Sequence, residues 1–203
     1  SAMAASMWRL VYGTVLLVFL PVSLEAAPKP VVAHIQCQVC KLALKQLRGV
    51  AKNKSIDEEE QLQDLVENAC SPKKEEGKWV AQIDIIRDSS RVPRGDKSEL
   101  VIDKQDKVGE CGSECSAVQQ ACKKSLEGRE EAIVSMLRDS AGLAKLQNDI
   151  CFKSCRQKSL PKLDAWRDEK FKEDPDAAVN ALKETMKGMP GMENLNVINP
   201  RQD

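Results

Sequence analysis

The sequence predicts a mainly α-helical domain, stapled by disulfide bonds, with a β-hairpin inserted between its second and third helices. Three observations predict this fold class. Apolar residues recur at helical spacing in five segments, one stretch is instead rich in β-branched residues, and the 203-residue chain contains eight cysteines. Because only 3% of the residues are aromatic, we expect a core that is mainly aliphatic.

Residues 1–27 predict a secretory signal peptide. Arg9 precedes an uncharged apolar run at residues 10–20, and the small residues Ser23, Ala26 and Ala27 follow it. The run is well short of the roughly 20 apolar residues that a membrane-spanning helix needs, so we expect no transmembrane anchor after cleavage. A signal peptide and an even number of cysteines together predict the secretory pathway, in the endoplasmic reticulum lumen or as a secreted protein, with paired cysteines.

The first two predicted helices carry three of the cysteines. Helical spacing of apolar residues extends over residues 32–50 and includes Cys37 and Cys40. The second helix is expected to begin with a cap at Ser55 or Asp57 and to run to Cys70.

The third helix carries Cys111, Cys115 and Cys122 on one predicted face, because steps of three and four residues connect them through Val118. A short fourth helix is predicted around residues 133–137. The fifth, at residues 143–155, carries Cys151 and Cys155.

The hairpin insertion is predicted at about residues 78–104. Residues 79–86 and 99–103 favour strands and flank a polar loop. The edge of such a hairpin can add to a strand of another protein, so Trp79, Ile83 and Ile85 are candidate partner-binding residues. The loop also holds Arg-Gly-Asp at residues 94–96, which gives integrin binding as a minor alternative.

Residues 160–203 predict an acidic tail, with seven basic and nine acidic residues and no cysteine. Asp174-Pro175-Asp176 is expected to start a short amphipathic helix. At residues 186–192, methionines alternate with glycine and proline. Met189 and Met192 could there present an adaptable apolar surface to a partner, and a disordered tail is the alternative.

The order of the cysteines predicts two of the disulfide bonds. If the first and last helices pack antiparallel, the early cysteine of one meets the late cysteine of the other. This predicts the bonds Cys37–Cys155 and Cys40–Cys151. Cys70 would then pair across the hairpin insertion with a cysteine of the third helix, which this argument does not single out.

The cysteines also resemble a known family. Cys37-Gln38-Val39-Cys40, a cysteine that closes the second helix, one on the third and two near the end resemble saposin B-type domains. Val66–Cys70, Trp79 with Ile83–Ile85, and Cys111–Cys122 are similar to the MIR-interacting saposin-like proteins of plants and algae. These are relatives of the animal canopy proteins, which are associated with Toll-like receptor folding.

The resemblance covers about residues 33–125 well and extends to Gly188–Met192. It implies a saposin-like helical bundle over residues 28–159. It also implies the bond Cys70–Cys122, which leaves Cys111 and Cys115 for each other. Two cysteines four residues apart on one helix are only marginally close enough for good disulfide geometry.

Charge and residue content exclude several functions. The 31 basic and 31 acidic residues balance, whereas nucleic acids and anionic membranes select net basic chains. His34 is the only histidine and is expected to be a surface or capping side chain. The sequence has no P-loop and no zinc-type ligand set, so we expect no cofactor and no metal.

The resemblance implies a non-enzymatic protein of the secretory pathway, an adaptor or co-chaperone whose partners are secretory or membrane-receptor client proteins. Two alternatives stay open at this point. One is saposin-type lipid binding, and the other is thiol-disulfide oxidoreduction at Cys37-Gln38-Val39-Cys40. Asn53-Lys54-Ser55 is in addition an N-glycosylation sequon, with Asn53 as the acceptor.

Overall fold

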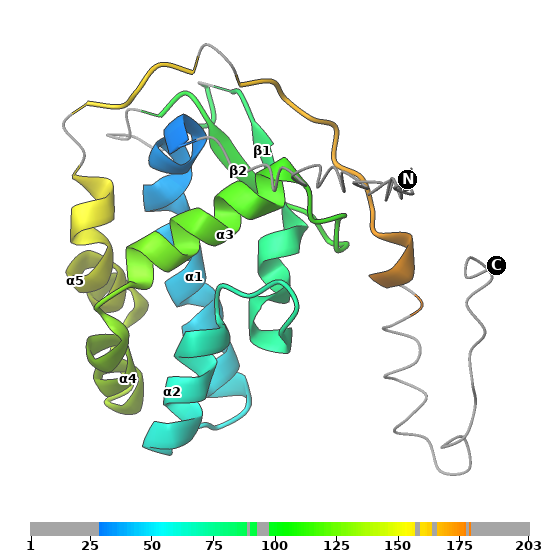
Figure 1. Cartoon of the computed structure of the whole chain (residues 1–203). Helices are drawn as coiled ribbons and strands as arrows, with labels where there is room; N and C mark the ends of the chain where they lie inside the picture. The colour runs from blue at the N-terminus through cyan, green and yellow to red at the C-terminus, as the bar shows by residue number, and fades with distance from the viewer. Residues whose placement is uncertain are drawn as a thin grey trace, which may run out of the picture.

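The computed structural model describes residues 29–88, 90–92, 98–156, 159–163, 166–177 and 179. Four predictions lie outside these residues: the signal peptide at 1–27, the Arg-Gly-Asp triplet at 94–96, and the partner-binding roles of Met189 and Met192. The described part is mainly helical with one small two-stranded sheet, as predicted (Figure 1). None of its helices is long and apolar enough to cross a membrane.

Helix α1 (Lys29–Asn53) is the central element of the fold. Helix α3 (Ser113–Leu126) crosses it and α5 (Leu143–Cys155) packs beside it, which buries α1 on more than one face (Figure 1). The core is almost entirely aliphatic, as the low aromatic content predicts. Its fully buried side chains on α1 include Ile35, Val39, Ala43 and Leu44.

Helices α2 (Glu59–Asn68) and α4 (Glu130–Arg138) pack against each other at one end of α1. The predicted cap of α2 at Ser55 or Asp57 is wrong, because Glu58 is the N-cap residue and its side chain makes no capping bond. The reason lies at the end of α1, where Ser55 adopts a φ of 52° and the Ile56 amide donates to the Ala51 carbonyl oxygen. Ser55 therefore closes α1 instead of starting α2.

The hairpin consists of β1 (Ile83–Ile86) and β2 (Val101–Lys104), paired antiparallel with Ile85 opposite Ile102. The prediction of a strand from Trp79 is wrong, since residues Glu75–Gln82 form the 3₁₀ helix η1. The Trp79 indole donates to the Ala69 carbonyl oxygen at 2.9 Å, which holds η1 against the end of α2. A Cβ on Gly77 would lie 2.2 Å from the Ser71 carbonyl oxygen, so only glycine permits this close turn.

All eight cysteines form disulfide bonds, and the four pairs are those expected. Cys37–Cys155 and Cys40–Cys151 join α1 to α5, and Cys70–Cys122 joins the turn after α2 to α3. The predicted common helical face is wrong for Cys111, because this residue precedes the first residue of α3, and its Cα lies 5.0 Å from that of Cys115. So many disulfides indicate an oxidising, secretory or extracellular environment.

The chain after α5 packs back over the hairpin end of the molecule. We call residues 159–163 and 166–174 the strap (Figure 1). Leu163 of the strap is buried in the core, and Glu173 forms a β-bridge with Gly109. Helical backbone follows at residues 175–177 and 179, where the short helix of the tail is predicted to begin. The first part of the predicted tail is therefore packed against the domain.

Candidate functional site

A cleft of about 500 Å³ lies where the hairpin, the start of α3 and the strap meet. Ala81 and Ile83 line it on the hairpin side, residues 110 and 112–115 line it at the start of α3, and residues 169–172 line it on the strap. Three segments far apart in the sequence thus form its walls. We refer to this hollow as the cleft.

The edge of β1 that points away from β2 borders the cleft. The Ile85 amide points away from β2 and donates to Oε2 of Glu114 at 2.9 Å. Along an antiparallel strand, alternate residues direct their amide and carbonyl groups to the same side. The main-chain groups of Ile83, two residues earlier and opposite Lys104, therefore also point away from β2, on the side of the hairpin that borders the cleft, although only 3% of this residue is exposed.

The outer edge of β2 is covered by a side chain from α1. The amide nitrogen of Gln38 donates to the Leu100 carbonyl oxygen at 2.9 Å, and its amide oxygen accepts from the Ile102 amide at 3.1 Å. Gln38 thus occupies the positions that a neighbouring strand would use. The β1 edge beside Ile83, in contrast, borders the cleft.

Glu114, in the first turn of α3, connects β1 to the strap. Besides the Ile85 amide, its carboxyl accepts a hydrogen bond from the Glu169 amide at 3.3 Å. Burial raises the pKa of Glu114 to about 7 against the two main-chain hydrogen bonds, which lower it, and the nearby carboxylates of Asp84 and Asp168 raise it further. Glu114 is therefore a carboxyl that changes protonation state near neutral pH.

Asp84 on β1 is the second perturbed carboxyl at this place. Burial raises its pKa first, and the negative charges of Asp168 and Asp103 add to the effect, while hydrogen bonding to Glu114 and to the Ile85 amide lowers it. Its Oδ1 atom is buried and finds no hydrogen-bond partner within the described part of the chain. A buried acceptor without a donor is costly, so this atom marks a place where a proton would stabilise the structure.

His34 ties the start of α1 to the hairpin loop and to the strap. The prediction of a surface or capping side chain is wrong, because only 3% of this residue is exposed. Nδ1 accepts from the Glu99 amide at 3.3 Å, so the hydrogen resides on Nε2, which donates to the Pro161 carbonyl oxygen at 2.9 Å. The sequence gives no signal for this role, since its partners, two main-chain groups and the Ser98 hydroxyl, lie far along the chain.

Two aromatic contacts fix the rest of the strap. The Arg87 guanidinium lies 5.5 Å from the ring centroid of Trp166 and donates to the Leu163 carbonyl oxygen. The Phe171 ring packs onto Gly109, where an added Cβ would lie 2.7 Å from the ring. Gly109 is therefore required for the strap to approach the hairpin this closely.

No protein family, curated protein or solved structure matches this chain.

The predicted partner-binding side chains of the hairpin are not on the surface. Trp79, Ile83 and Ile85 are 4%, 3% and 0% exposed, and all three belong to the hydrophobic core. Their β-branched and aromatic character reflects packing of the hairpin onto the helices.

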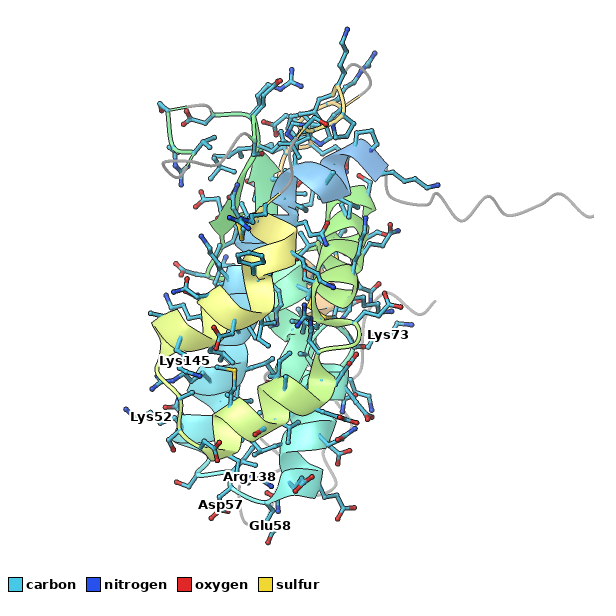
Figure 2. All side chains as sticks on the ribbon, turned by 90° about the vertical axis from the view of Figure 1, so that its left-hand side faces the viewer. Lys52, Asp57, Glu58, Lys73, Arg138 and Lys145 are labelled. Atoms are coloured by element: carbon cyan, nitrogen blue, oxygen red, sulfur yellow. A yellow bond between two sulfur atoms is a disulfide. The ribbon has the colours of Figure 1, made fainter. Side chains whose placement is uncertain are left out.

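The opposite end of the molecule is a charged, solvated surface. Figure 2 shows Lys52, Asp57, Glu58 and Arg138 there, near the end of α1, on side chains that are all exposed. Positive and negative charges alternate, and Arg138 pairs with Glu59 at 2.6 Å. Asn53, the acceptor of the predicted glycosylation site, is exposed at this end as the last residue of α1.

The described structure bears on the two alternatives of the sequence analysis, thiol-disulfide oxidoreduction and lipid binding. Cys37 and Cys40 are each bonded to α5 and not to one another, so they do not form the dithiol that an oxidoreductase uses. The apolar helix faces are packed against each other, with side chains such as Ile35, Leu62 and Leu146 fully buried. Phe152 on α5 is the large apolar side chain that stands out as exposed, at 52%.

Proposed function

We propose that this chain is a non-enzymatic, polypeptide-binding accessory protein of the secretory pathway, an adaptor or co-chaperone for client proteins. The observation that carries the proposal is the cleft of about 500 Å³ that lies beside the outer edge of β1, between the hairpin and the strap. An extended segment of a client can add its own main chain to such an edge. Main-chain hydrogen bonds then provide affinity and the neighbouring side chains provide selectivity.

The lining of the cleft suits a polypeptide better than a lipid chain. Apolar groups from Ala81, Ile83 and Phe171 lie beside charged side chains of both signs, including Glu110 and Lys172. A lipid acyl chain needs a wall that is apolar throughout, whereas a peptide segment offers polar main chain and mixed side chains together. The cleft is also open enough to admit a segment from outside.

The resemblance to saposin B-type domains, and among them to the canopy-related MIR-interacting proteins, supports the same proposal. A helical body with four disulfides and a small hairpin is compatible with it. On this basis the clients are secretory or membrane-receptor proteins, met in the endoplasmic reticulum lumen or after secretion. Lipid binding would require the packed helices to separate, and disulfide exchange would require a free thiol.

The proposal is tested with a permanently unfolded polypeptide, such as reduced and alkylated lactalbumin, whose binding to the purified protein is followed by fluorescence anisotropy. Gly112 lines the cleft as the N-cap of α3, and a Cβ there would meet nothing within 4 Å. Gly112→Phe therefore places a bulky side chain at the wall of the cleft, with no clash at its Cβ. We expect it to weaken binding at least about ten-fold, the equivalent of about 1.4 kcal/mol.

Gly142→Phe is the matched control. Gly142 is likewise a helix N-cap, that of α5, with open space around its Cβ, and it lies away from the residues that line the cleft. Both substitutions exchange glycine for phenylalanine at a helix start, so they share any cost of capping. Binding that is unaffected by Gly112→Phe, or equally weakened by both variants, would contradict the proposal.

A further inference from the structure

One of the four disulfides, Cys111–Cys115, lies in the wall of the cleft. Cys115 lines the cleft directly. Glu110 and Gly112, the neighbours of Cys111 along the chain, line it as well. Cys111 is exposed, whereas Cys115 is only 4% exposed. The outer member of this bond is therefore accessible to a reagent at the cleft, while the inner member is packed in the wall.

This disulfide does not connect distant parts of the chain. The other three bonds join cysteines that are 52, 111 and 118 residues apart, whereas Cys111 and Cys115 are 4 residues apart. Main-chain hydrogen bonds already hold the same turn, because the Gly112 amide donates to the Glu110 carbonyl oxygen and the Ser116 amide donates to that of Gly112. Opening the bond should therefore leave the helices in place, since it frees only a short loop.

Cys37–Cys155 is a second disulfide with an exposed member, and it provides a comparison. In thiol–disulfide exchange, an incoming thiolate bonds to one sulfur and the other sulfur leaves as a thiolate. Attack at the exposed Cys111 would release Cys115, in the first turn of α3, where the positive end of the helix dipole stabilises a thiolate. Attack at the exposed Cys155 would release Cys37, which lies well inside α1 and away from either helix end.

Charged side chains near the cleft do not reverse this difference. Glu110, Lys170 and Lys172 are exposed and include both signs, so solvent and salt screen them. Glu114 is half-buried, and its carboxyl accepts from main-chain amides of β1 and the strap, whose dipoles offset part of its negative charge. The N-terminus of α3 therefore remains the main electrostatic difference between the two disulfides with an exposed member.

We propose that Cys111–Cys115 is an exchangeable disulfide that oxidises a pair of cysteine thiols on an unfolded polypeptide bound at the cleft. A thiolate of the polypeptide attacks Sγ of Cys111, which forms a mixed disulfide and releases Cys115 as a thiolate. A second thiolate of the polypeptide then attacks the polypeptide's own sulfur in the mixed disulfide, and Cys111 leaves. Two electrons pass to the protein, the two protons of the polypeptide's thiols end on Cys115 and Cys111, and the polypeptide gains one disulfide.

The exchange goes beyond polypeptide binding, and its substrate class rests on the proposed function. A segment bound in the cleft would hold its cysteines close to Cys111, which raises their effective concentration at the bond. The free thiol that the reaction needs comes from the polypeptide, because all eight cysteines of the chain are bonded. The reaction is a stoichiometric exchange, in which one bond of the protein oxidises one pair of thiols.

The test mixes the purified protein, without oxygen, with reduced lactalbumin whose thiols are free. N-Ethylmaleimide stops the reaction at intervals, and mass spectrometry of proteolytic peptides measures the labelling of each cysteine. We expect Cys111–Cys115 to be opened and labelled at least about ten-fold faster than Cys37–Cys155, with two lactalbumin thiols lost for each bond opened. Equal labelling of the two bonds, or faster labelling of Cys37–Cys155, would overturn the proposal.

The double substitution Cys111→Ser with Cys115→Ser removes only the disulfide at the cleft. We expect it to slow the loss of lactalbumin thiols at least about ten-fold, since the three bonds that remain are poorer acceptors. Helical circular dichroism checks that the variant is folded. Oxidation of lactalbumin by the folded variant at the wild-type rate would contradict the proposal. Should the variant fail to fold, the labelling of the wild-type protein decides alone.

Dithiothreitol in place of lactalbumin separates exchange from binding, because a small dithiol needs no cleft. We expect the same preference for Cys111–Cys115, and its absence would overturn the assigned reactivity of this bond. A preference with dithiothreitol but not with lactalbumin would overturn the polypeptide as the substrate. The binding test with Gly112→Phe uses an alkylated polypeptide without thiols, so the two proposals fail separately.

Discussion

The two ends of this molecule are stabilised by different means. The helical body, formed by α1, α3 and α5 with α2 and α4, combines a closed aliphatic core with three disulfides that join residues far apart in sequence. The hairpin and strap depend instead on strands of four residues, a buried histidine and a pair of carboxyls. The disulfide-bonded body therefore fixes the wall of the cleft at the start of α3. The wall formed by the strap depends on polar contacts, which single substitutions can remove.

The four disulfides are expected to contribute unequally to stability. Cys37–Cys155 already brings Cys40 and Cys151 close together in the unfolded chain, so Cys40–Cys151 closes only a short additional loop. Cys70–Cys122 closes an independent loop of 52 residues. Cys111–Cys115, next to the cleft, spans 4 residues. The entropy that each bond removes from the unfolded chain follows these lengths.

The largest expected decrease in the free energy of unfolding comes from removing the Cys70–Cys122 disulfide. The double substitution Cys70→Ala with Cys122→Ala should lower the free energy of unfolding by about 4 kcal/mol, against about 2 kcal/mol for Cys111→Ala with Cys115→Ala. Urea denaturation of both variants measures the difference. Equal losses would show that the body and the cleft end are not stabilised differently by their disulfides.

The next largest decrease in the free energy of unfolding is expected from a core substitution in the helical body. Leu44 on α1 is completely buried, so Leu44→Ala should reduce the free energy of unfolding by about 3 kcal/mol through lost burial and the cavity that remains. Phe152→Ala on α5 removes a larger but exposed side chain, with its contact to Arg156, and should cost less than about 1 kcal/mol. The same denaturation measurement applies, and a larger loss for Phe152→Ala would contradict the assignment of the core.

At the other end, His34→Ala should cost about 2 kcal/mol, because the Glu99 amide and the Pro161 carbonyl oxygen lose their shared partner. His34→Gln retains one donor and one acceptor and should cost less. Hydrogen exchange is expected to rise in residues 98–100 and 159–163 while α5 stays protected. A uniform rise over all helices would mean that the two ends unfold as one unit.

The pH dependence of stability follows from Glu114. Its pKa is raised in the folded protein from the ordinary 4.5 to about 7, so its stabilising contribution is complete below pH 4.5 and disappears as the pH rises through 7. Since the group is partly exposed, we expect the free energy of unfolding to fall by only about 1 kcal/mol between pH 5 and pH 8. Denaturation of the wild type and of Glu114→Gln at both pH values measures this, and an equal fall in the variant would assign it to other groups.

The smallest structural effect is expected at Asn53. When the chain is expressed in a eukaryotic secretory pathway, Asn53 should carry a glycan, since it is exposed at the end of α1. Ser55→Ala should remove the glycan, seen as a mobility shift that a glycosidase reproduces. Binding to the cleft should not change, because β1, which borders the cleft, lies at the opposite end of α1 in Figure 1. A wild-type protein without the glycan would contradict the prediction.

The sequence predicted the body better than the hairpin end. Helical spacing and cysteine order are local patterns, and they yield the five helices and the pairing of α1 with α5. The start of β1 was placed too early, because Trp79 is fixed by the end of α2 and not by a strand partner. His34, Glu114 and the strap were missed because their contacts join a side chain to main-chain groups far along the sequence, as that of His34 with Pro161 does across 127 residues.

The central claim is that an extended polypeptide binds in the cleft, between β1 and the strap. The most direct test is a photo-crosslinking amino acid placed at Lys170, which lines the cleft, or at Lys145, which lies on the exposed face of α5 that Figure 2 shows. With the unfolded polypeptide added, we expect a covalent adduct from position 170 and none from position 145. Adducts of equal yield from both positions, or from position 145 alone, would contradict it.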